Sequence, residues 1–205
     1  MQPFTTHTGI VAPLDRVNVD TDQIIPAQFL KRTERTGFGP FLFFSWRLLP
    51  NGKPNPDFEL NAPGYQNATI LVSGRNFGGG SSREHAVWAI TDAGFRAVIA
   101  PSFAEIFHKN CFDNGLVPVL LPQELINSLI AKAKAFPGYR LTVDLERREV
   151  RDEEDFRTPL VVHGDPETDQ FRRYCLLNGL DDIALTLQHE DKILAYERQN
   201  SQKMA

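Results

Sequence analysis

Apolar residues in the middle of the chain occur either in short continuous runs or at helical spacing. Three short runs are typical of buried strands: 68–73, 96–100 and 116–121. The segments that follow these runs have the spacing expected of helices: 83–94, 101–112 and 123–135. Pro118 has no N–H to donate to a sheet, so the third strand is expected at an edge or a bulge. Strands and helices that alternate in this way favour an α/β domain.

The two ends of the chain are less regular. Residues 8–13 predict a short strand, and a cluster of turn formers follows at 18–22. Residues 139–150 predict a hairpin. One C-terminal helix is predicted from the spacing of its apolar residues, Leu180, Ile183, Leu187 and Leu194. Irregular β structure on both sides of a strand–helix centre indicates a three-layer α/β domain.

Size and charge narrow the class of protein. The 205 residues carry a net charge of −4, and 41% of them are apolar, which is enough for one packed domain. A net acidic chain without a basic run is a poor candidate for binding nucleic acid. The longest strongly apolar run, 38–46, has nine residues, whereas a membrane span needs about 20. The N-terminus lacks the basic and apolar regions of a secretory signal, so we expect a cytoplasmic protein without a nucleic-acid or membrane partner.

Cysteine content limits the metal chemistry of this chain. Cys111 and Cys175 are the only two cysteines, and they are far apart in the sequence. Two thiols cannot form a four-cysteine zinc site, and a cubane iron–sulfur cluster also takes its ligands from cysteine thiolates. We therefore predict no metal site in this chain and expect each cysteine to be a small buried apolar residue. Any metal in its chemistry must come from elsewhere.

The most informative segment is the glycine-rich run 73–86, which lies between a predicted strand and a predicted helix. Backbone N–H groups at a helix start attract anions, and the successive glycines Gly78 to Gly80 let the backbone approach a ligand closely. A phosphate loop is rejected because Gly80 stands where that loop needs a lysine, and the dinucleotide-binding spacing G-x-G-x-x-G is absent. The segment therefore indicates an anion site that is not a nucleotide site.

A structural alternative for this run is a capping box, with Ser81 as N-cap and Glu84 reaching back to it. That alternative explains one serine and one glutamate. It does not explain three glycines, a second serine or Arg83, whose charge opposes the helix dipole at this end. An anionic ligand, above all a carboxylate bound by both arms of a guanidinium, accounts for all of these residues. His85 and His108 are expected to pack rather than to act as bases.

The run 80–86, with the sequence GSSREHA, resembles the signature loop of the swivelling domain of the aconitase superfamily. Further segments are similar to the small subunits of bacterial 3-isopropylmalate dehydratases: 8–9, 18–26, 29–31, 36–39, 55–58, 101–107 and 178–181. The resemblance runs over roughly residues 4–197. It has two departures, because Gly79 stands where the family's turn commonly carries Cys, and Val87 stands where Pro is common.

The resemblance implies a three-layer β/β/α swivelling domain over residues 1–205, with a C-terminal helical extension at about 165–200. It also implies a hydro-lyase of leucine biosynthesis, which isomerises 2-isopropylmalate and 3-isopropylmalate through isopropylmaleate. The small subunits of the family work in a heteromer. A [4Fe-4S] cluster is held by the partner large subunit, in agreement with the low cysteine content of this chain.

The resemblance also implies roles for individual residues. Ser81 is expected to act as a catalytic base and Arg83 to hold a substrate carboxylate, in a dicarboxylate site that includes Ser82 and Gly80. In the segment Asp20–Thr21–Asp22, Asp22 is the stronger candidate for the site, although a plain turn is an even alternative. The segment 28–35, with Lys31 and Arg32, resembles the loop that covers the substrate and selects its C3 substituent.

Three alternatives stay open. In one alternative, the chain belongs to a related enzyme whose substrate is a different diacid, such as homoaconitate or citraconate. In another, the same fold is a non-catalytic anion-binding module. The phenylalanines between residues 38 and 44 either line a pocket for the isopropyl group or, in the favoured interpretation, pack in the core or against the large subunit. Exposed aromatic residues at 38–46 favour self-association without the partner.

Overall fold

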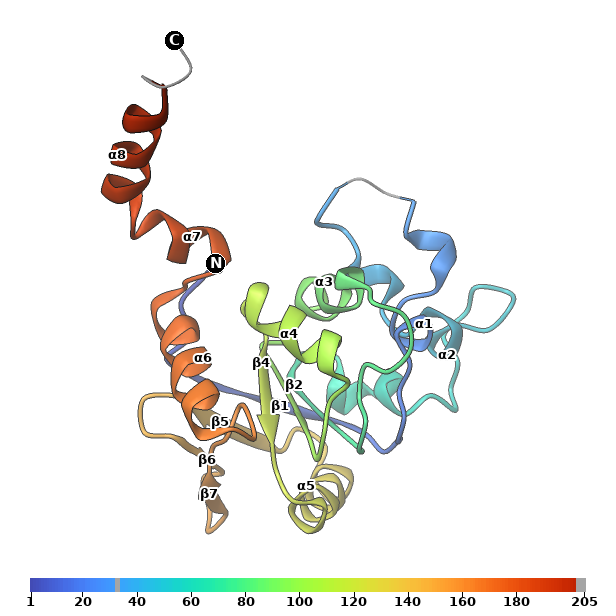
Figure 1. The fold of residues 1–205 in the computed structure, drawn as a ribbon. Helices are drawn as coiled ribbons and strands as arrows, with labels where there is room; N and C mark the ends of the chain where they lie inside the picture. Colours follow the sequence, from blue (N-terminus) through green and yellow to red (C-terminus); the bar gives the residue numbers. More distant parts are fainter. Residues whose placement is uncertain (32–33, 202–205) are drawn as a thin grey trace.

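The computed structural model describes residues 1–31 and 34–201, and in it seven strands form one mixed sheet in the order β4-β3-β2-β1-β5-β6-β7 (Figure 1). The strands are β1 (Thr6–Leu14), β2 (Ala68–Ser73), β3 (Ala97–Ala100), β4 (Val117–Leu120), β5 (Arg140–Asp144), β6 (Glu149–Arg151) and β7 (Arg157–Pro159). The helices are α1 (Thr21–Ile24), α2 (Phe44–Arg47), α3 (Glu84–Asp92), α4 (Glu105–Asp113), α5 (Gln123–Ala135), α6 (Pro166–Asn178), α7 (Asp182–Leu187) and α8 (Glu190–Ser201). Short 3₁₀ helices lie at Ala27–Phe29, Gly39–Phe41, Glu59–Asn61 and Pro63–Tyr65.

The first four strands form a parallel half-sheet, as the alternation of strands and helices predicted. β1, β2, β3 and β4 pair in parallel, so their carboxyl ends lie at one edge. The helices that connect them, α3 and α4, share an apolar cluster with one face of this half-sheet through Leu71, Val87 and Val98. Pro118 lies in β4, the outermost strand of this half, which confirms the edge position expected from its missing N–H.

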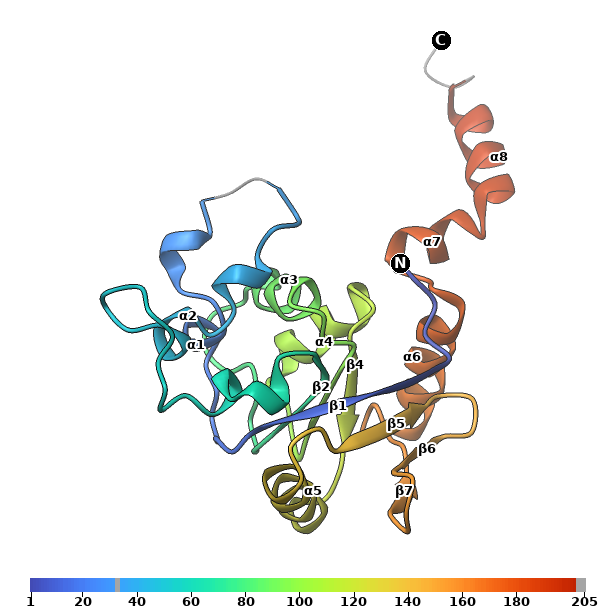
Figure 2. The same ribbon diagram turned by 180° about the vertical axis from the view of Figure 1, so that it is seen from behind.

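The remaining strands form an antiparallel half that curls over the other face of the parallel half. β5 pairs antiparallel with β1, and the hairpin predicted at 139–150 is formed by β5 and β6. Side chains of both halves belong to one apolar cluster together with α5 and α6: Ile70, Ile99, Val119, Leu129, Val143, Val150 and Leu176. Helices, parallel strands and antiparallel strands therefore form three layers (Figure 2).

The curl brings the two ends of the sheet together along a line that we call the seam, formed by residues 108, 120, 161–163 and 169. The Leu120 N–H on β4 donates to the Val161 carbonyl, beyond β7, at 2.8 Å. His108 Nε2 lies 2.8 Å from the Val162 carbonyl. The buried Asp169 carboxylate accepts from the Val162 N–H at 2.7 Å and the His163 N–H at 3.1 Å. The bonds of Leu120 and His108 join segments that are distant in sequence, and those of Asp169 hold the chain at 162–163 in place.

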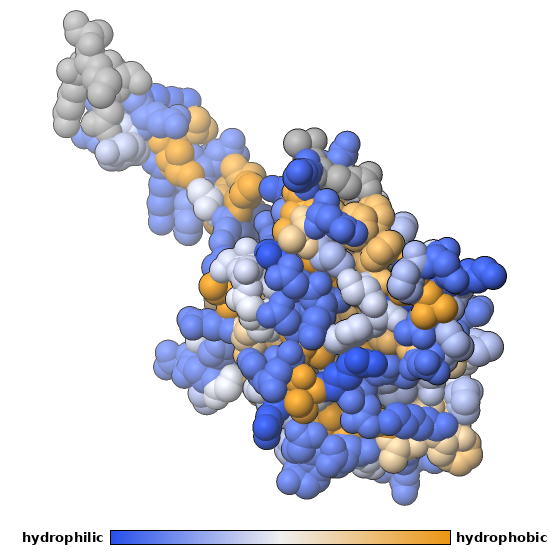
Figure 3. Space-filling model, turned by 90° about the vertical axis from the view of Figure 1, so that its right-hand side faces the viewer, coloured by the Kyte–Doolittle hydropathy of each residue, from blue (hydrophilic) through white to orange (hydrophobic). Residues whose placement is uncertain are grey.

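The prediction of one continuous C-terminal helix is wrong. Leu180 lies in the connection between α6 and α7, where Asp181 caps α7 by accepting from the Ala184 N–H. The helix is also interrupted between Leu187 and Leu194, because α7 ends at Leu187 and α8 begins at Glu190. α7 and α8 then form an arm that stands away from the rest of the molecule (Figures 1 and 2). The apolar residues that indicated a buried helix face are largely exposed on this arm, Ile183 at 72% and Leu187 at 57% (Figure 3). No helix among residues 1–31 and 34–201 is long and apolar enough to cross a membrane.

The long connection from β1 to β2 carries most of the aromatic residues. Phe38 and Phe43 are buried in the core, whereas Phe41, Phe44 and Trp46 are half-buried. Phe41 stacks on Phe29 with ring centroids 4.1 Å apart. This packing agrees with the favoured core interpretation, and it corrects the expectation of exposed aromatic residues at 38–46, because their faces are used within the chain.

Candidate active site

The glycine-rich turn meets two other connections at the carboxyl ends of the parallel strands. The turn follows β2, residues 15–20 follow β1, and residues 101–104 follow β3. The Gly78 N–H donates to the Val19 carbonyl at 2.8 Å, and the Ala104 N–H donates to the Phe77 carbonyl at 2.9 Å. Ligand sites of open parallel sheets commonly lie at this edge. Backbone hydrogen bonds therefore fix the turn from both sides.

Two of the three glycines are required by their surroundings. Gly78 has φ 80°, and an added Cβ would lie 2.1 Å from Phe107 Cγ. Gly80 has φ 86°, and its Cβ would lie 2.2 Å from Asp20 Oδ2. Both positions combine a left-handed backbone with a close approach, so only glycine fits without strain. At Gly79, in contrast, an added Cβ meets nothing closer than Asn76 Nδ2 at 3.7 Å, so this position has room for a side chain.

The capping box considered for Ser81 and Glu84 is wrong. α3 begins at Glu84 with Arg83 as its N-cap, and no side chain caps it. Glu84 instead accepts from Asn114 Nδ2 at 2.9 Å. A capping box does occur at α1, where Asp20 accepts from the Asp22 N–H and Gln23 Oε1 accepts from the Asp20 N–H. The two serines of the turn are consequently not used as helix caps.

A small cavity of about 160 Å³, which we call the turn cavity, opens beside the glycine-rich turn. It is lined by Thr21, Gly78, Gly80, Ser81, Arg83, Ala104, Glu105, Ile106 and Phe107. The first turn of α4 forms one wall, and its N-cap Ala104 offers no side-chain cap to the free N–H groups of that turn. Two helix N-termini without side-chain caps, those of α3 and α4, thus border the same cavity and favour a negatively charged ligand.

The contribution of α4 was missed in the sequence, although a signal was present. Residues 101–107 follow β3, which runs parallel to β2, and the carboxyl ends of neighbouring parallel strands lie at the same edge of a sheet. The segment therefore had to lie beside the turn. A larger hollow of about 410 Å³ lies elsewhere, between α5 and β5, and its Lys132 is already paired with Asp152 at 2.8 Å. The residues of the glycine-rich turn line the smaller cavity and not the larger one.

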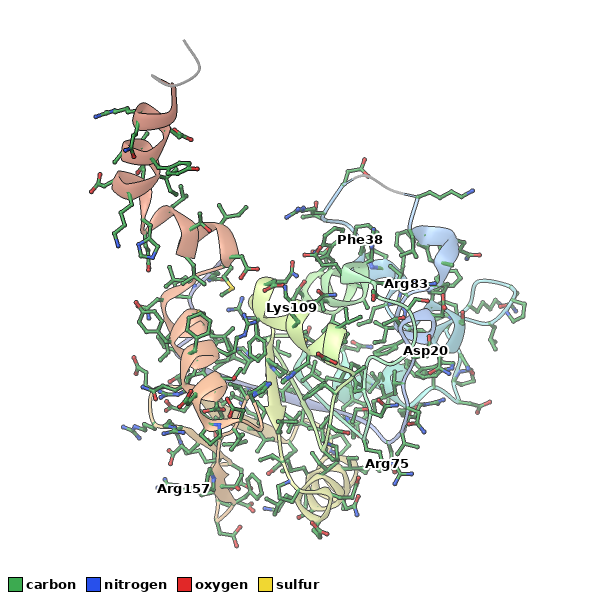
Figure 4. The ribbon with its side chains drawn as sticks, in the orientation of Figure 1. Asp20, Phe38, Arg75, Arg83, Lys109 and Arg157 are labelled. Carbon is green, nitrogen blue, oxygen red and sulfur yellow. The ribbon has the colours of Figure 1, made fainter. Side chains whose placement is uncertain are left out.

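Arg83 and Asp22 form an ion pair at the mouth of this site, between guanidinium Nη1 and Oδ1. The Arg83 side chain is 17% exposed and that of Asp22 is 51% exposed. Ser81 and Ser82 are both exposed, with no side-chain hydrogen bond among the described residues. Figure 4 shows Arg83 and Asp20 on the same side of the molecule, beside α1. The structure brings Ser81, Arg83, Gly80 and Asp22 together and leaves the serine hydroxyls accessible.

The basic residues expected in the covering loop lie outside this constellation. Lys31 is exposed, two residues after the end of the short 3₁₀ helix Ala27–Phe29, and does not line the turn cavity. Arg32 lies outside the described residues.

The two histidines considered as bases are used in packing. His85 lies against Trp88 and Phe38, with ring centroids 4.6 Å and 5.3 Å away, and burial lowers its pKa. His108 stacks on Phe103 at 5.3 Å, and burial lowers its pKa to about 4. Both imidazoles are neutral at pH 7, and neither lines the turn cavity.

Neither cysteine is suited to hold an iron–sulfur cluster. Cys111 is fully buried on α4, and burial raises its pKa well above that of a free thiol. Cys175 is buried on α6, and burial raises its pKa as well. A cluster needs thiolates that share a site, so the residues of this chain do not fit one.

The fold and the site define a swivelling domain of the aconitase type, in which a glycine-rich turn at the edge of a curled mixed sheet carries two exposed serines and an arginine. The family model of the aconitase C-terminal domain matches residues 1–124, and a model of the C-terminal domain of 3-isopropylmalate dehydratase small subunits matches residues 182–204. The chain belongs to the 3-isopropylmalate dehydratase small subunit family. It is thus the small subunit of a hydro-lyase of leucine biosynthesis, and the name small subunit implies a large-subunit partner.

Relatives in the family match nearly the whole chain. The 3-isopropylmalate dehydratase small subunit of Brevibacillus brevis is 58% identical over 197 residues, which are 96% of this chain and 98% of the relative. That of Koribacter versatilis is 57% identical over 198 residues, covering 97% and 98% of the two chains. The crystal structure of a 3-isopropylmalate dehydratase from Methanocaldococcus jannaschii superimposes with a TM-score of 0.63 at 24% identity, over 94% of this chain and 99% of that chain. This likeness confirms the fold.

Proposed function

We propose that the turn cavity binds a hydroxy diacid and that this chain, together with a large subunit, interconverts 2-isopropylmalate and 3-isopropylmalate through isopropylmaleate. The observation that carries the proposal is that Ser81 and Arg83 border one cavity together with the uncapped starts of α3 and α4. Such a site favours carboxylates through hydrogen bonds and the helix dipoles. Family membership at 58% identity supports the choice of substrate.

Ser81 is the base in this proposal. Its alkoxide takes the proton from the carbon next to a carboxylate, the electron pair of that C–H bond forms the double bond, and hydroxide leaves the neighbouring carbon. Hydroxide then adds to the carbon that lost the proton, and the Ser81 hydroxyl gives its proton to the carbon that lost the hydroxyl group, which restores the alkoxide. An unaided serine is far too weak a base near pH 7, so the alkoxide needs stabilisation of several kcal/mol. The uncapped amides of α3 and α4 and the Arg83 guanidinium are its sources here.

Arg83 holds one substrate carboxylate in a bidentate manner, with Ser82 as an additional donor. In the chain alone, Asp22 accepts from this guanidinium. Half-exposed Asp22 is screened by water, and a substrate carboxylate replaces it on Arg83. For Lys31 and Arg32, a contact with the substrate is proposed on the resemblance of segment 28–35 to the covering loop of the family.

The [4Fe-4S] cluster belongs to the large subunit in this proposal. It supplies a Lewis acid for the departing hydroxyl group. Two buried cysteines in the present chain support this division of labour. We further propose that residues 1–205 act as one swivelling domain, to which the helices after about residue 165 are an extension.

Reconstitution tests this function. The full chain, co-expressed with a large subunit of the family, is expected to isomerise isopropylmalate, and the chain alone is expected to be colourless and inactive. Parallel assays with homoaconitate and citraconate measure the selectivity. A complex that carries the cluster and turns over another diacid but not isopropylmalate contradicts the substrate assignment, and a complex without any hydro-lyase activity contradicts the catalytic role.

A further inference from the structure

Thr21 makes two hydrogen bonds that enclose Gly80. Its backbone N–H donates to the Gly79 carbonyl at 2.8 Å, and its hydroxyl donates to the Ser81 carbonyl at 2.9 Å. The residue is 1% exposed, so water does not compete for these bonds. One side chain of the β1 connection thus fixes the main chain of the turn at the residue proposed as base.

We propose that Thr21 is a positioning residue for Ser81, acting through the hydrogen bond from its hydroxyl to the Ser81 carbonyl. This inference rests on the proposed role of Ser81 as the base. Thr21 itself transfers no proton in the reaction. Its hydroxyl proton is committed to the Ser81 carbonyl at 2.9 Å.

Peptide geometry explains why a bond to this carbonyl matters. The peptide group is planar and trans, so fixing the Ser81 carbonyl toward Thr21 directs the Ser82 N–H away from Thr21. The same bond fixes the Ser81 main chain, from which the Oγ projects. Gly80 has φ 86°, and a glycine without further contacts can adopt many other backbone conformations. Without the Thr21 hydroxyl, rotation about Gly80 moves Ser81 relative to Arg83.

Alternatively, Thr21 could only stabilise the fold. The neighbouring hydrogen bonds favour a positioning role, because they already hold α1 and the turn without the Thr21 hydroxyl. α1 is already held by the capping box of Asp20 and Gln23. The turn is already joined to the β1 connection by the Gly78 and Gly79 N–H groups, which both donate to the Val19 carbonyl. The hydroxyl bond of Thr21 adds one constraint beyond these, and it acts at Ser81.

The chain offers a matched control for a lost threonine hydroxyl. Thr142 on β5 is 8% exposed, and its Oγ1 lies 2.7 Å from the Thr8 Oγ1. Thr142 does not line the turn cavity. Thr21→Val and Thr142→Val therefore remove the same group from two buried hydrogen bonds, one at the turn and one within the sheet.

Kinetics of the complex reconstituted with the large subunit test the proposal. Thr21→Val is expected to lower kcat about 10- to 100-fold, because displacement of a catalytic group by an ångström has effects of this size. KM is expected within about twofold of the parent value, since Arg83 is untouched. Thr21→Ser keeps the donor and is expected to restore kcat, and Thr142→Val is expected to leave kcat unchanged. Should Thr21→Val not fold, Thr21→Cys, with a weaker donor, is measured in its place.

Hydrogen exchange in the full chain gives a readout that does not depend on turnover. The amides of residues 78–83 are expected to exchange at least about tenfold faster in Thr21→Val than in Thr21→Ser or Thr142→Val. If Ser81→Ala is inactive, Ser81 remains the proposed base. In that case, a parental kcat in Thr21→Val, or a loss of kcat in Thr142→Val equal to that in Thr21→Val, overturns the proposal for Thr21. An active Ser81→Ala variant instead overturns the base, and the role of Thr21 with it.

Discussion

The glycine-rich turn and the seam of the sheet both join segments that are distant in sequence, but they differ in whether their polar groups have hydrogen-bond partners. At the seam, Asp169 accepts two backbone N–H groups and His108 is paired with the Val162 carbonyl. At the turn, Ser81 and Ser82 are exposed without side-chain partners among the described residues, and no side chain caps α3 or α4. Satisfied groups stabilise a fold, whereas accessible unsatisfied groups are available to a ligand.

The comparison predicts that substitutions of Ser81 and Arg83 at the turn reduce activity without loss of stability and that substitutions at the seam do the reverse. The largest effect is expected for Ser81→Ala. Because the base is lost, kcat should fall by about 10³-fold or more. The exposed serine makes no side-chain bond to the described residues, so the melting temperature and binding of the large subunit should not change. Assay of the purified complex checks both, and retained turnover rules out Ser81 as the base.

Arg83→Lys should have the next largest effect. An ammonium group keeps the charge but not the two parallel N–H donors, so kcat/KM should fall about 10- to 100-fold, with much of the loss in KM. The ion pair with Asp22 is largely retained by lysine, so stability should change little. Asp22→Asn is the matched control, because it removes the resting partner and leaves the guanidinium. A parental KM in the lysine variant argues against a carboxylate clamp.

At the seam, Asp169→Ala is expected to lower the free energy of unfolding by about 3 kcal/mol. The carboxylate is 3% exposed, and its removal leaves the N–H groups of Val162 and His163 without their acceptor. Denaturant unfolding of the isolated chain measures the change. Once assembled, the complex should keep its parental kcat, because Asp169 does not line the turn cavity. A loss of kcat in the assembled complex would contradict the separation of the two regions.

Local signals in the sequence were sufficient for several strands and helices of the domain. The apolar run at 68–73 and the helical spacing at 123–135 coincide with β2 and α5. The closing of the sheet was not predictable in this way, because the bond from Leu120 to Val161 depends on how far the whole sheet curls. Local signals also failed at the C-terminus, where the apolar spacing continued from Leu187 to Leu194 but the helix was interrupted between α7 and α8.

At the turn, too, the local sequence is not sufficient to predict the structure. Both Asp20-x-x-Gln23 and Ser81-x-x-Glu84 are capping-box sequences, and only the first forms one. The second is prevented by contacts outside the segment. The Thr21 hydroxyl holds the Ser81 carbonyl, and Asn114 bonds Glu84. Serine and arginine could be assigned to an anion site from residue types and from the resemblance, whereas the wall formed by α4 required the sheet order.

A smaller effect is expected from acid at the seam. Folding holds His108 neutral, with its pKa lowered to about 4 by burial, whereas the unfolded chain takes up a proton below about pH 6.5. Stability should therefore fall as the pH drops from about 6.5 to 4, by about 1–3 kcal/mol from this group, with His163 and Arg172 adding to the cost of protonation. His108→Gln should flatten the slope in this window. If urea titrations show the same dependence of the free energy of unfolding on pH in this variant, other groups cause the loss of stability in acid.

The smallest effect is expected at Gly79. A substitution there tests whether the space for a side chain differs between neighbouring positions of the turn. An added Cβ there approaches only Asn76 Nδ2 at 3.7 Å, so Gly79→Ala should change the free energy of unfolding by less than about 0.5 kcal/mol. Gly78→Ala is the matched comparison, because its Cβ would lie 2.1 Å from Phe107 Cγ at φ 80°. It should cost several times more, since a left-handed backbone and a clash combine. If both variants lose the same free energy of unfolding, the main chain of the turn can shift to accommodate a Cβ at either position. The left-handed conformation of Gly78 would then follow from its sequence neighbours rather than from the contact with Phe107.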